Sequence, residues 1–301
     1  MIYVPVEHEV DPSSVPDAPL RAPAPSGGLV DVWGRSYLLR LLVRKEILSR
    51  YSGSFLGLLW SYVMPAMRFF IYFFVIGVIM GLHKDVPAFG IHMFAGLVFA
   101  HYFTETFSAG TRAIVKNRSI LTKMPMPKEM FPVASMLVSA FHVIPGMVIL
   151  TVAGYLIGWR PDPAGLLAGA MGFLIVSLLG TALALLFSAA NVFFRDFGNI
   201  VSTLTLFVHF TVPMVYPYAL VQARFGAFAK FYLLNPVAEA VLLNQRCFWV
   251  GATGHPARYI RTDMPDHLFL IGFGQIGLTL VILVFSQMWF SRLEGKFVER
   301  L

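Results

Sequence analysis

The uncharged run AGLLAGAMGFLIVSLLGTALALLFSAA (Ala164–Ala190) sets the class of this protein. A helix that crosses a bilayer needs about 20 mostly apolar residues, and this run is long enough. The rest of the chain agrees, because 57% of its 301 residues are hydrophobic and only 13% are charged. A typical soluble domain has about 45–50% apolar and about 25% charged residues. Lipid is therefore the expected solvent, which argues against a soluble enzyme, a disordered chain or a collagen-like fibre.

Similar apolar runs recur along the chain. Five more are long enough to span a membrane, namely Phe55–Leu82, Ile91–Thr111, Pro132–Ile157, Asn199–Leu220 and His267–Phe290. We therefore predict an all-α integral membrane protein with six transmembrane helices. Lysine and arginine gather before the first run, between the second and third, and after the last, whereas the opposite short loops hold only Lys84 and Arg160. The positive-inside rule then places both termini in the cytoplasm of a multi-pass protein of the cell membrane.

Two segments differ from these runs. Residues 1–33 are rich in proline and poor in bulky apolar residues, which predicts a disordered cytoplasmic tail before a transmembrane domain at 34–301. The last outer loop contains Val237–Val250, an apolar run interrupted by polar residues and too short to cross a membrane. It is expected to form a re-entrant or interfacial helix.

Motifs for ATP binding and catalysis are absent. No G-x-x-x-x-G-K-[ST] occurs, and the Gly295-Lys296 pair is followed by Phe297, so no P-loop is present. H-E-x-x-H and G-x-S-x-G are also missing, and the single cysteine, Cys247, excludes an internal disulfide and a cysteine-cluster metal site. We expect no catalytic residue, metal or cofactor in this chain, and an external energy source for any uphill transport.

Two basic segments are candidates for contact with a partner. Arg35–Arg50 interleaves basic and apolar residues, as a helix in the headgroup plane would, and either anchors the chain or also docks a partner. Lys116–Lys128 combines basic residues with Pro125 and Pro127, which stop a helix and hold the chain extended. It is either a stiff lever between two spans or an ordinary positive-inside loop.

Charged side chains within spans are functional candidates. Arg68 lies in the first predicted span, and His101 and Glu105 share one face of the second. At about 1.5 Å per residue, Arg68 and Glu105 lie roughly 10 Å apart in depth, so a direct pair requires strong tilt. Each then needs another partner or water, which indicates a polar cavity, or a buried interhelical hydrogen bond as the alternative.

Aromatic residues make up 15% of the chain. They either pack helices and anchor them at the membrane interfaces, or line a channel for a sugar chain. Apolar ring faces bind the C–H face of a pyranose weakly, which lets a polymer slide. The candidate channel or substrate residues are Trp60, Tyr62, Arg68, Phe69, Tyr72, His101, Glu105, Phe207, Phe210 and Tyr216.

Several motifs together resemble the ABC-2 type polysaccharide-export permeases, whose members export O-antigen, teichoic acid or mycobacterial cell-wall galactan. The similarity is greatest to the galactan exporters and covers residues 35–301. In order, the motifs are Arg50–Trp60 with Pro65, Leu121–Pro132, Asn191–Asp196, Val212–Pro217, and Leu234–Pro236 with Arg246. One departure is Val212-Pro213, where relatives often have Ser-Pro.

The resemblance implies a half-transporter for a polyprenyl-diphosphate-linked polysaccharide. Two copies of the chain would form one channel, and two cytoplasmic P-loop ATPase subunits would supply ATP and Mg²⁺ chemistry. Nucleic acid is not an expected partner. The implied ATPase-coupling residues are Arg35, Arg40, Arg44, Lys45, Lys116, Arg118, Lys123, Met124, Pro125 and Pro127, and the implied gate residues are Asn235, Pro236, Glu239 and Arg246.

Two other functions remain open at this point. One is an exporter of drugs or small lipids, which a test of substrates would distinguish. The other is a membrane enzyme acting on lipid-linked sugars, which would need paired acids or a metal. The acids of the long outer loop, Glu239, Asp263 and Asp266, have no spacing that suggests a catalytic dyad.

Overall fold

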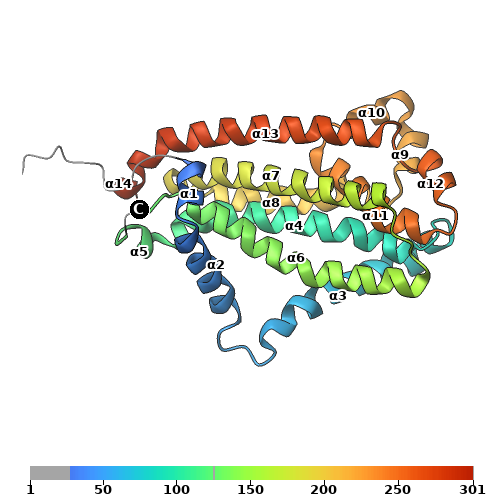
Figure 1. Cartoon of the computed structure of the whole chain (residues 1–301), viewed down its shortest axis with the longest axis horizontal. Coiled ribbons are helices and arrows are strands. Elements are labelled where there is room, and N and C mark those ends of the chain that lie inside the picture. The colour runs from blue at the N-terminus through green and yellow to red at the C-terminus, as the bar shows by residue number, and fades with distance from the viewer. Residues whose placement is uncertain (1–27, 125, 301) are drawn as a thin grey trace, which may run out of the picture.

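The computed structural model describes residues 28–124 and 126–300, which form helices and helical turns without a β-strand. Figure 1 shows an elongated bundle. Its helices are α1 (Leu29–Gly34), α2 (Ser36–Tyr51), α3 (Trp60–Tyr72), α4 (Phe89–Lys116), α5 (Arg118–Leu121), α6 (Met130–Ile157), α7 (Pro163–Phe193), α8 (Phe197–Thr211), α9 (Tyr218–Phe225), α10 (Ala229–Tyr232), α11 (Pro236–Ala252), α12 (Pro256–Thr262), α13 (Leu268–Leu293) and α14 (Phe297–Arg300).

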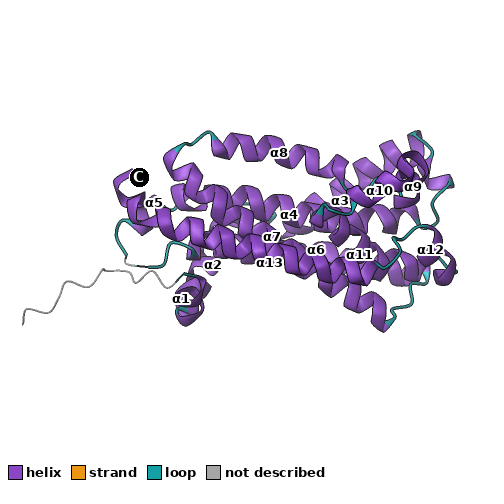
Figure 2. Cartoon of the chain, turned by 90° about the horizontal axis from the view of Figure 1, so that it is seen from above, coloured by secondary structure: helices purple, strands orange, loops and turns teal. Residues whose placement is uncertain are grey.

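The bundle is built around α4 and α7. Helix α7 packs against α4, α11 and α13, while α4 also contacts α6, α8 and α11. The short helices α1, α5 and α14 lie at one end, and α9, α10 and α12 lie at the other (Figure 1). Figure 2 shows α8 along one side of the bundle, where it packs against α4. Helices α2 and α3 form a V that opens toward α6, with the loop that joins them at the apex farthest from the bundle (Figure 1).

Local sequence explains several helix boundaries. The Asp162 side chain accepts a hydrogen bond from Gly165 N at 3.1 Å, and Pro163 follows at the first position of α7. The Asn235 side chain accepts from Val237 N at 3.0 Å, again with proline at the first helical position. Both are standard N-terminal caps. Gly158 ends α6 in the left-handed conformation, at φ 95°.

Small residues allow the central helices to approach closely, as in other membrane bundles. A Cβ atom added to Gly172 of α7 would lie 2.8 Å from the Ala240 carbonyl oxygen of α11 and 3.0 Å from the Phe99 ring. A side chain at this position must therefore push α11 away from α7.

Gly172→Leu is expected to destabilise the bundle by about 1–3 kcal/mol, the usual cost of overpacking. The thermal melting midpoint of the purified chain in mild detergent measures this effect. Gly274→Leu on α13 is the matched control, since a Cβ there meets nothing within 4 Å. Equal melting temperatures for the two variants would contradict close α7–α11 packing.

The described residues contain four helical segments long and apolar enough to cross a membrane, or five if one bent pair counts as a span. The four are Trp60–Ile79 (α3 with a π-helical extension), Met130–Ile157, Pro163–Phe193 and Leu268–Lys296, and the bent pair is Tyr218–Tyr232 with Pro236–Ala252, at 116°. The predicted count of six is thus not confirmed. The predicted span 91–111 lies in α4, which is not among the four because the polar residues of this buried helix make it less apolar than they are. The predicted span 199–220 is broken, since α8 ends at Thr211 and has only 15 residues.

Helix α11 was predicted to be re-entrant or interfacial, and its burial excludes only the interfacial placement. The predicted run 237–250 is helical, but instead of lying at an interface it is buried along its whole length between α4 and α7. Its polar residues are held inside the bundle, where Asn244 Nδ2 donates to Ala95 O at 2.8 Å and Gln245 Nε2 to Pro213 O at 2.7 Å. Cys247, on the same helix, is 4% exposed and faces Gly169 of α7.

The N-terminal helices begin earlier than the predicted domain boundary. Most of the predicted tail, residues 1–27, lies outside the described residues. Residues 29–34 form α1, and its Val32 is buried with Leu39 and Leu42 of α2 in a cluster at this end of the bundle. In the folded chain α2 is amphipathic, because these leucines are buried while most of its basic residues are exposed.

Candidate functional site

A polar groove of about 1060 Å³ runs along α4 and is walled by α2, α3, α6 and α8. Its charged and histidine residues come from four helices: Glu46, Arg50, Arg68, His101, Glu105, Arg112, Lys116 and His209. Hydroxyl groups from Ser49, Thr104, Ser108, Ser135, Ser139 and Thr205 line it as well. This is the polar cavity that the in-span charges predicted.

One face of α4 supplies the floor of this groove. His101, Glu105, Ser108, Arg112 and Lys116 all line it, and they follow one another at intervals of three or four residues. That spacing places them in one stripe along an α-helix. The stripe spans about 22 Å at 1.5 Å per residue, from the α5 end of the bundle toward its middle.

Glu105 is the centre of an ion network at mid-groove. Its carboxylate, 12% exposed, pairs with Arg50 of α2 and accepts from His101 Nε2 at 3.3 Å. Arg50 also lies 2.7 Å from His142 Nδ1 on α6. Arg68 of α3 lies 2.6 Å from His101 Nδ1. His101 thus connects Arg68 to Glu105, which agrees with the prediction that those two residues do not pair directly.

Other contacts fix the end of the groove near α5. Lys116 pairs with Glu46 of α2, and Lys45 Nζ donates to Asn117 Oδ1 at 3.1 Å, so α2 is tied to the end of α4. Arg112 donates to Gly198 O at 2.9 Å and also contacts Ser202 Oγ, which holds the start of α8. Arg50 and Arg112 were not predicted as substrate-site residues, and only the four-residue spacing of Arg112 from Ser108 could have indicated its position.

The predicted aromatic channel residues do not form one surface. Tyr72 and Phe210 line the groove, whereas Phe69 packs against Phe73 and Phe94. Trp60, Tyr62 and Phe207 are exposed on α3 and α8 outside the groove lining. Tyr216 Oη donates to Phe210 O at 2.9 Å and lies 3.2 Å from Tyr232 Oη. A channel role for these rings therefore stays a prediction.

The predicted gate residues occupy separate places. Asn235 caps α11, and Pro236 is its first residue. Glu239 is 0% exposed, and neither of its carboxyl oxygens has a hydrogen-bond partner in the described part of the chain. Arg246 instead forms a bidentate pair with Asp162, at 2.9 and 2.7 Å. This pair joins α11 to the start of α7.

The Arg246 guanidinium and, in addition, the Gly165 amide hold the pKa of the Asp162 carboxyl below its ordinary value, against a smaller opposing effect of burial. The unfolded value is about 3.9. Because the folded-state pKa is lower, the stabilisation is present above the unfolded value and is lost as pH falls toward the folded one.

Asp162→Asn is therefore expected to lower the melting temperature at neutral pH, since asparagine keeps the cap but not the ion pair. The gap between wild type and variant should stay constant from about pH 7 to pH 5 and shrink below about pH 4. Thermal unfolding in detergent across this range measures it. A gap that persists unchanged to pH 3 would show that the ion pair is not its source.

The predicted coupling residues gather at the α5 end of the bundle. Arg35, Arg40, Arg44 and Lys45 lie on or beside α2, and Lys116, Arg118, Lys123, Met124 and Pro127 lie at or after the end of α4 (Figure 1). Pro125 lies outside the described residues. Arg118, Lys123 and Met124 are exposed, while Pro127 is buried. The adjacent Lys128 Nζ donates to Glu294 O at 2.5 Å, which ties this segment to the end of α13.

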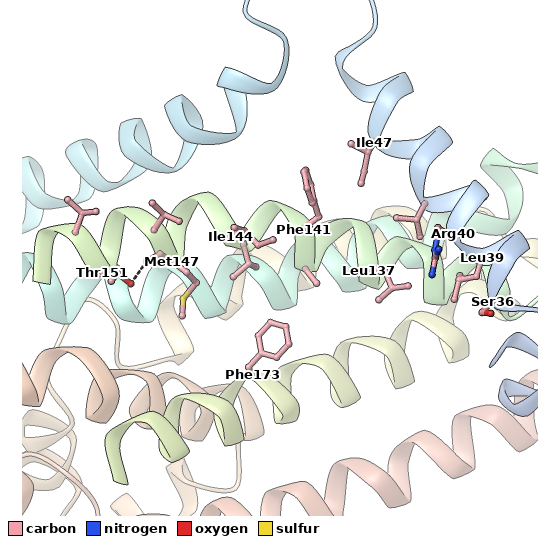
Figure 3. A pocket seen from close by; sticks show the side chains of 15 residues that line it. Ser36, Leu39, Arg40, Ile47, Leu137, Phe141, Ile144, Met147, Thr151 and Phe173 are labelled. Carbon is pink, nitrogen blue, oxygen red and sulfur yellow. Dashed lines mark hydrogen bonds between the residues drawn. The ribbon is translucent and has the colours of Figure 1, made fainter. Parts of the chain in front are cut away.

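A second groove, of about 890 Å³, is lined by α6 and by an adjacent face of α2. Figure 3 shows Phe141, Ile144 and Met147 of α6 lining it together with Leu39 and Ile47 of α2, and Phe173 of α7 below. Arg40 and Ser36 stand at one end. The lining is otherwise nearly all apolar, and Thr151 Oγ1 is satisfied by Met147 O at 2.8 Å. Helix α2 thus lines both a charged groove and an apolar one.

No set of three histidine, cysteine, aspartate or glutamate residues in the described ranges is arranged to hold a metal ion. His101 and Glu105 are instead engaged with arginine side chains.

Comparison with known proteins gives the class of this one. The family model described as ABC-2 type transporter matches residues 37–245, more than half of the chain and most of the helices that wall both grooves. The chain belongs to the ABC-2 type transporter family. It is therefore a multi-pass membrane protein of a transporter family, and the resemblance seen in its motifs is confirmed.

Curated relatives agree. An O-antigen export system permease protein RfbA of Myxococcus xanthus is 30% identical over 212 residues, which cover 70% of this chain and 80% of the relative. Two proteins of the same name from Klebsiella pneumoniae are 23% and 24% identical over 265 residues, or 87% of this chain and 94% of each relative.

Proposed function

We propose that this chain is the transmembrane subunit of an ATP-driven exporter that moves a polyprenyl-diphosphate-linked polysaccharide to the outer face of the membrane. The observation that carries this is the pair of grooves that α2 helps to line, one charged and one apolar. An amphiphile with an anionic head and a long apolar tail matches both. The relatives' names support a polysaccharide, and a cell-wall galactan or an O-antigen-like glycan is the proposed cargo.

In this proposal the chain crosses the membrane six times. Helix α4 has 28 residues, about 42 Å, and its polar side chains face the polar groove or neighbouring helices, so it need not be apolar to span. Helix α8 has 15 residues, about 22 Å, and the extended segment after Thr211 continues toward the far end. The basic α5 end is placed in the cytoplasm with both termini.

The proposed transporter contains two copies of the chain and two cytoplasmic ATPase subunits, which bind ATP and Mg²⁺. The α2 and α5 region offers the ATPase contact, since its exposed basic residues lie at the end of the bundle. The bent segment from α9 to α11 is the proposed outer gate. Exposed apolar residues on α3, such as Phe70 and Ile71, are available for lipid or a second copy.

Affinity purification of the tagged chain from its own membranes, with mass-spectrometric identification of bound proteins, is the first test. A P-loop ATPase at about equal stoichiometry is expected. The complex is then reconstituted, and ATP hydrolysis is measured with lipid-linked glycan or with small apolar compounds. Stimulation by the glycan supports the proposal. Stimulation by small apolar compounds alone would instead indicate a drug or small-lipid exporter, and repeated recovery of the chain alone would contradict an ATP-driven exporter.

A further inference from the structure

The charges in the polar groove do not balance within the described residues. Four cationic side chains line it, Arg50, Arg68, Arg112 and Lys116, against the two carboxylates of Glu46 and Glu105. Both carboxylates are already paired, Glu46 with Lys116 and Glu105 with Arg50.

The two remaining guanidinium groups have neutral partners. Arg68 contacts a ring nitrogen of His101, and Arg112 contacts Ser108, Ser202 and the Gly198 carbonyl. Excess positive charge between apolar helices creates a potential that favours an anion. The groove is therefore short of negative charge by about two units.

Glu105 shows how an anion can sit in this groove. Its carboxylate pairs with Arg50 and accepts a hydrogen bond from His101, and His101 in turn contacts Arg68. Guanidinium groups bind carboxylate and phosphate oxygens with the same fork of N–H donors. A phosphate oxygen at this position would therefore meet the same donors that Glu105 meets.

A buried hydroxyl nearby also lacks a partner. Ser139 of α6 lines the groove and is 2% exposed, and its Oγ makes no hydrogen bond to any described residue. A buried polar group is rarely left without a hydrogen-bond partner in a protein. It provides a neutral donor for a bound oxygen, in addition to the cations.

We propose that this groove binds the diphosphate group of a polyprenyl-linked substrate, and that Glu105 is the internal counter-ion which the diphosphate displaces. The proposal rests on the proposed function, because that function names an amphiphile with this head. A diphosphate esterified at both ends carries one negative charge on each phosphorus, which matches Arg68 and Arg112. The stripe of polar residues on α4 then provides a continuous polar path for the head from the α5 end toward mid-bundle.

The test measures binding of a short-chain polyprenyl diphosphate, with its fluorophore esterified to the terminal phosphate, to the full chain in lipid nanodiscs. Glu105→Gln removes the carboxylate that competes with the diphosphate, so binding is expected to tighten about tenfold. This factor corresponds to the free energy of one charge-assisted hydrogen bond, which the diphosphate no longer has to displace. Arg68→Gln is expected to weaken binding by a similar factor. Lys84→Gln, a cation in the loop after α3, is the matched control and should leave the affinity unchanged. Neutral polyprenol should bind all four chains equally.

Two further measurements keep the test decisive. Glu105→Asp keeps the charge and should not reproduce the tightening seen with Glu105→Gln, and melting temperatures of all variants establish that each is folded. Inorganic diphosphate should compete more weakly than the lipid, and equal affinity would assign the site to a free diphosphate and overturn the lipid assignment. Unchanged or weakened lipid binding in folded Glu105→Gln would overturn the counter-ion role.

Failure of the proposed function can be distinguished from failure of the proposed diphosphate site. If glycan does not stimulate ATP hydrolysis while the order of affinities holds, the anion site stands and the exporter assignment falls. If glycan stimulates hydrolysis while the variants bind alike, the exporter stands and the anion site falls.

Discussion

Glu239→Lys is expected to leave almost no folded chain in the membrane fraction, because it fixes a positive charge inside the bundle. Glu239 is 0% exposed, and neither carboxyl oxygen has a hydrogen-bond partner in the ranges that the structure covers. An uncompensated buried charge costs about 3–5 kcal/mol or more. The total stability of a native protein is only about 5–15 kcal/mol, so this loss is severe. Fluorescence-detected size exclusion of a tagged chain measures the folded fraction.

The matched control is Glu239→Gln, which keeps the shape of the side chain and brings no charge. It is expected to elute as a single peak close to wild type. A normal peak for the lysine variant would show that this position reaches water or an anion, and would contradict full burial. A collapse of both variants would mean that the carboxyl group itself has an essential partner.

Reversing two charges beside α5 is expected to remove the proposed ATPase from the purified complex. In Arg118→Glu/Lys123→Glu, both changed residues are exposed at the basic end of the bundle. Like charges placed across an interface cost several kcal/mol, so retention of the partner should fall by more than tenfold. Quantitative mass spectrometry of the purified complex measures the ratio of ATPase to transmembrane chain.

The control for this variant is Lys84→Glu/Arg160→Glu, which reverses two charges in the loops predicted to lie on the other side of the membrane. Its ATPase ratio should equal that of wild type. A partner ratio unaffected by the α5 changes, with the chain still folded, would remove this segment from the docking surface. It would then leave α2 as the remaining basic candidate.

Apolar runs were sufficient to predict the longest apolar helices of the bundle. Helices α6, α7 and α13 follow the predicted runs closely, because each is long and continuously apolar. Hydropathy was a poor guide for the helices that carry polar residues inside the bundle. Helix α4 carries polar side chains that contact neighbouring helices. Helix α11 is a short apolar helix with polar residues among the apolar ones, and it is fully enclosed because hydrogen bonds from Asn244 and Gln245 replace solvent.

The candidate site could be predicted only in part. The four-residue spacing of His101 and Glu105 places them on one face of a helix, and charges within a span are unusual enough to indicate a polar cavity. The partners come from helices distant in the sequence. Arg50 meets Glu105 across 55 residues of chain, and Arg112 meets Ser202 across 90. No local pattern encodes such pairings, since they depend on the path of α2 and α8 around α4.

Cys247 gives this chain a built-in reporter of bundle opening. It is the only thiol in the sequence, and it is enclosed between α11 and α7 with its Sγ facing Gly169. A maleimide or disulfide reagent can reach it only when those two helices separate, so the labelling rate at limiting reagent gives the free energy of that local opening. Every molecule has one such labelling site, and no cysteine has to be added or removed to measure the opening.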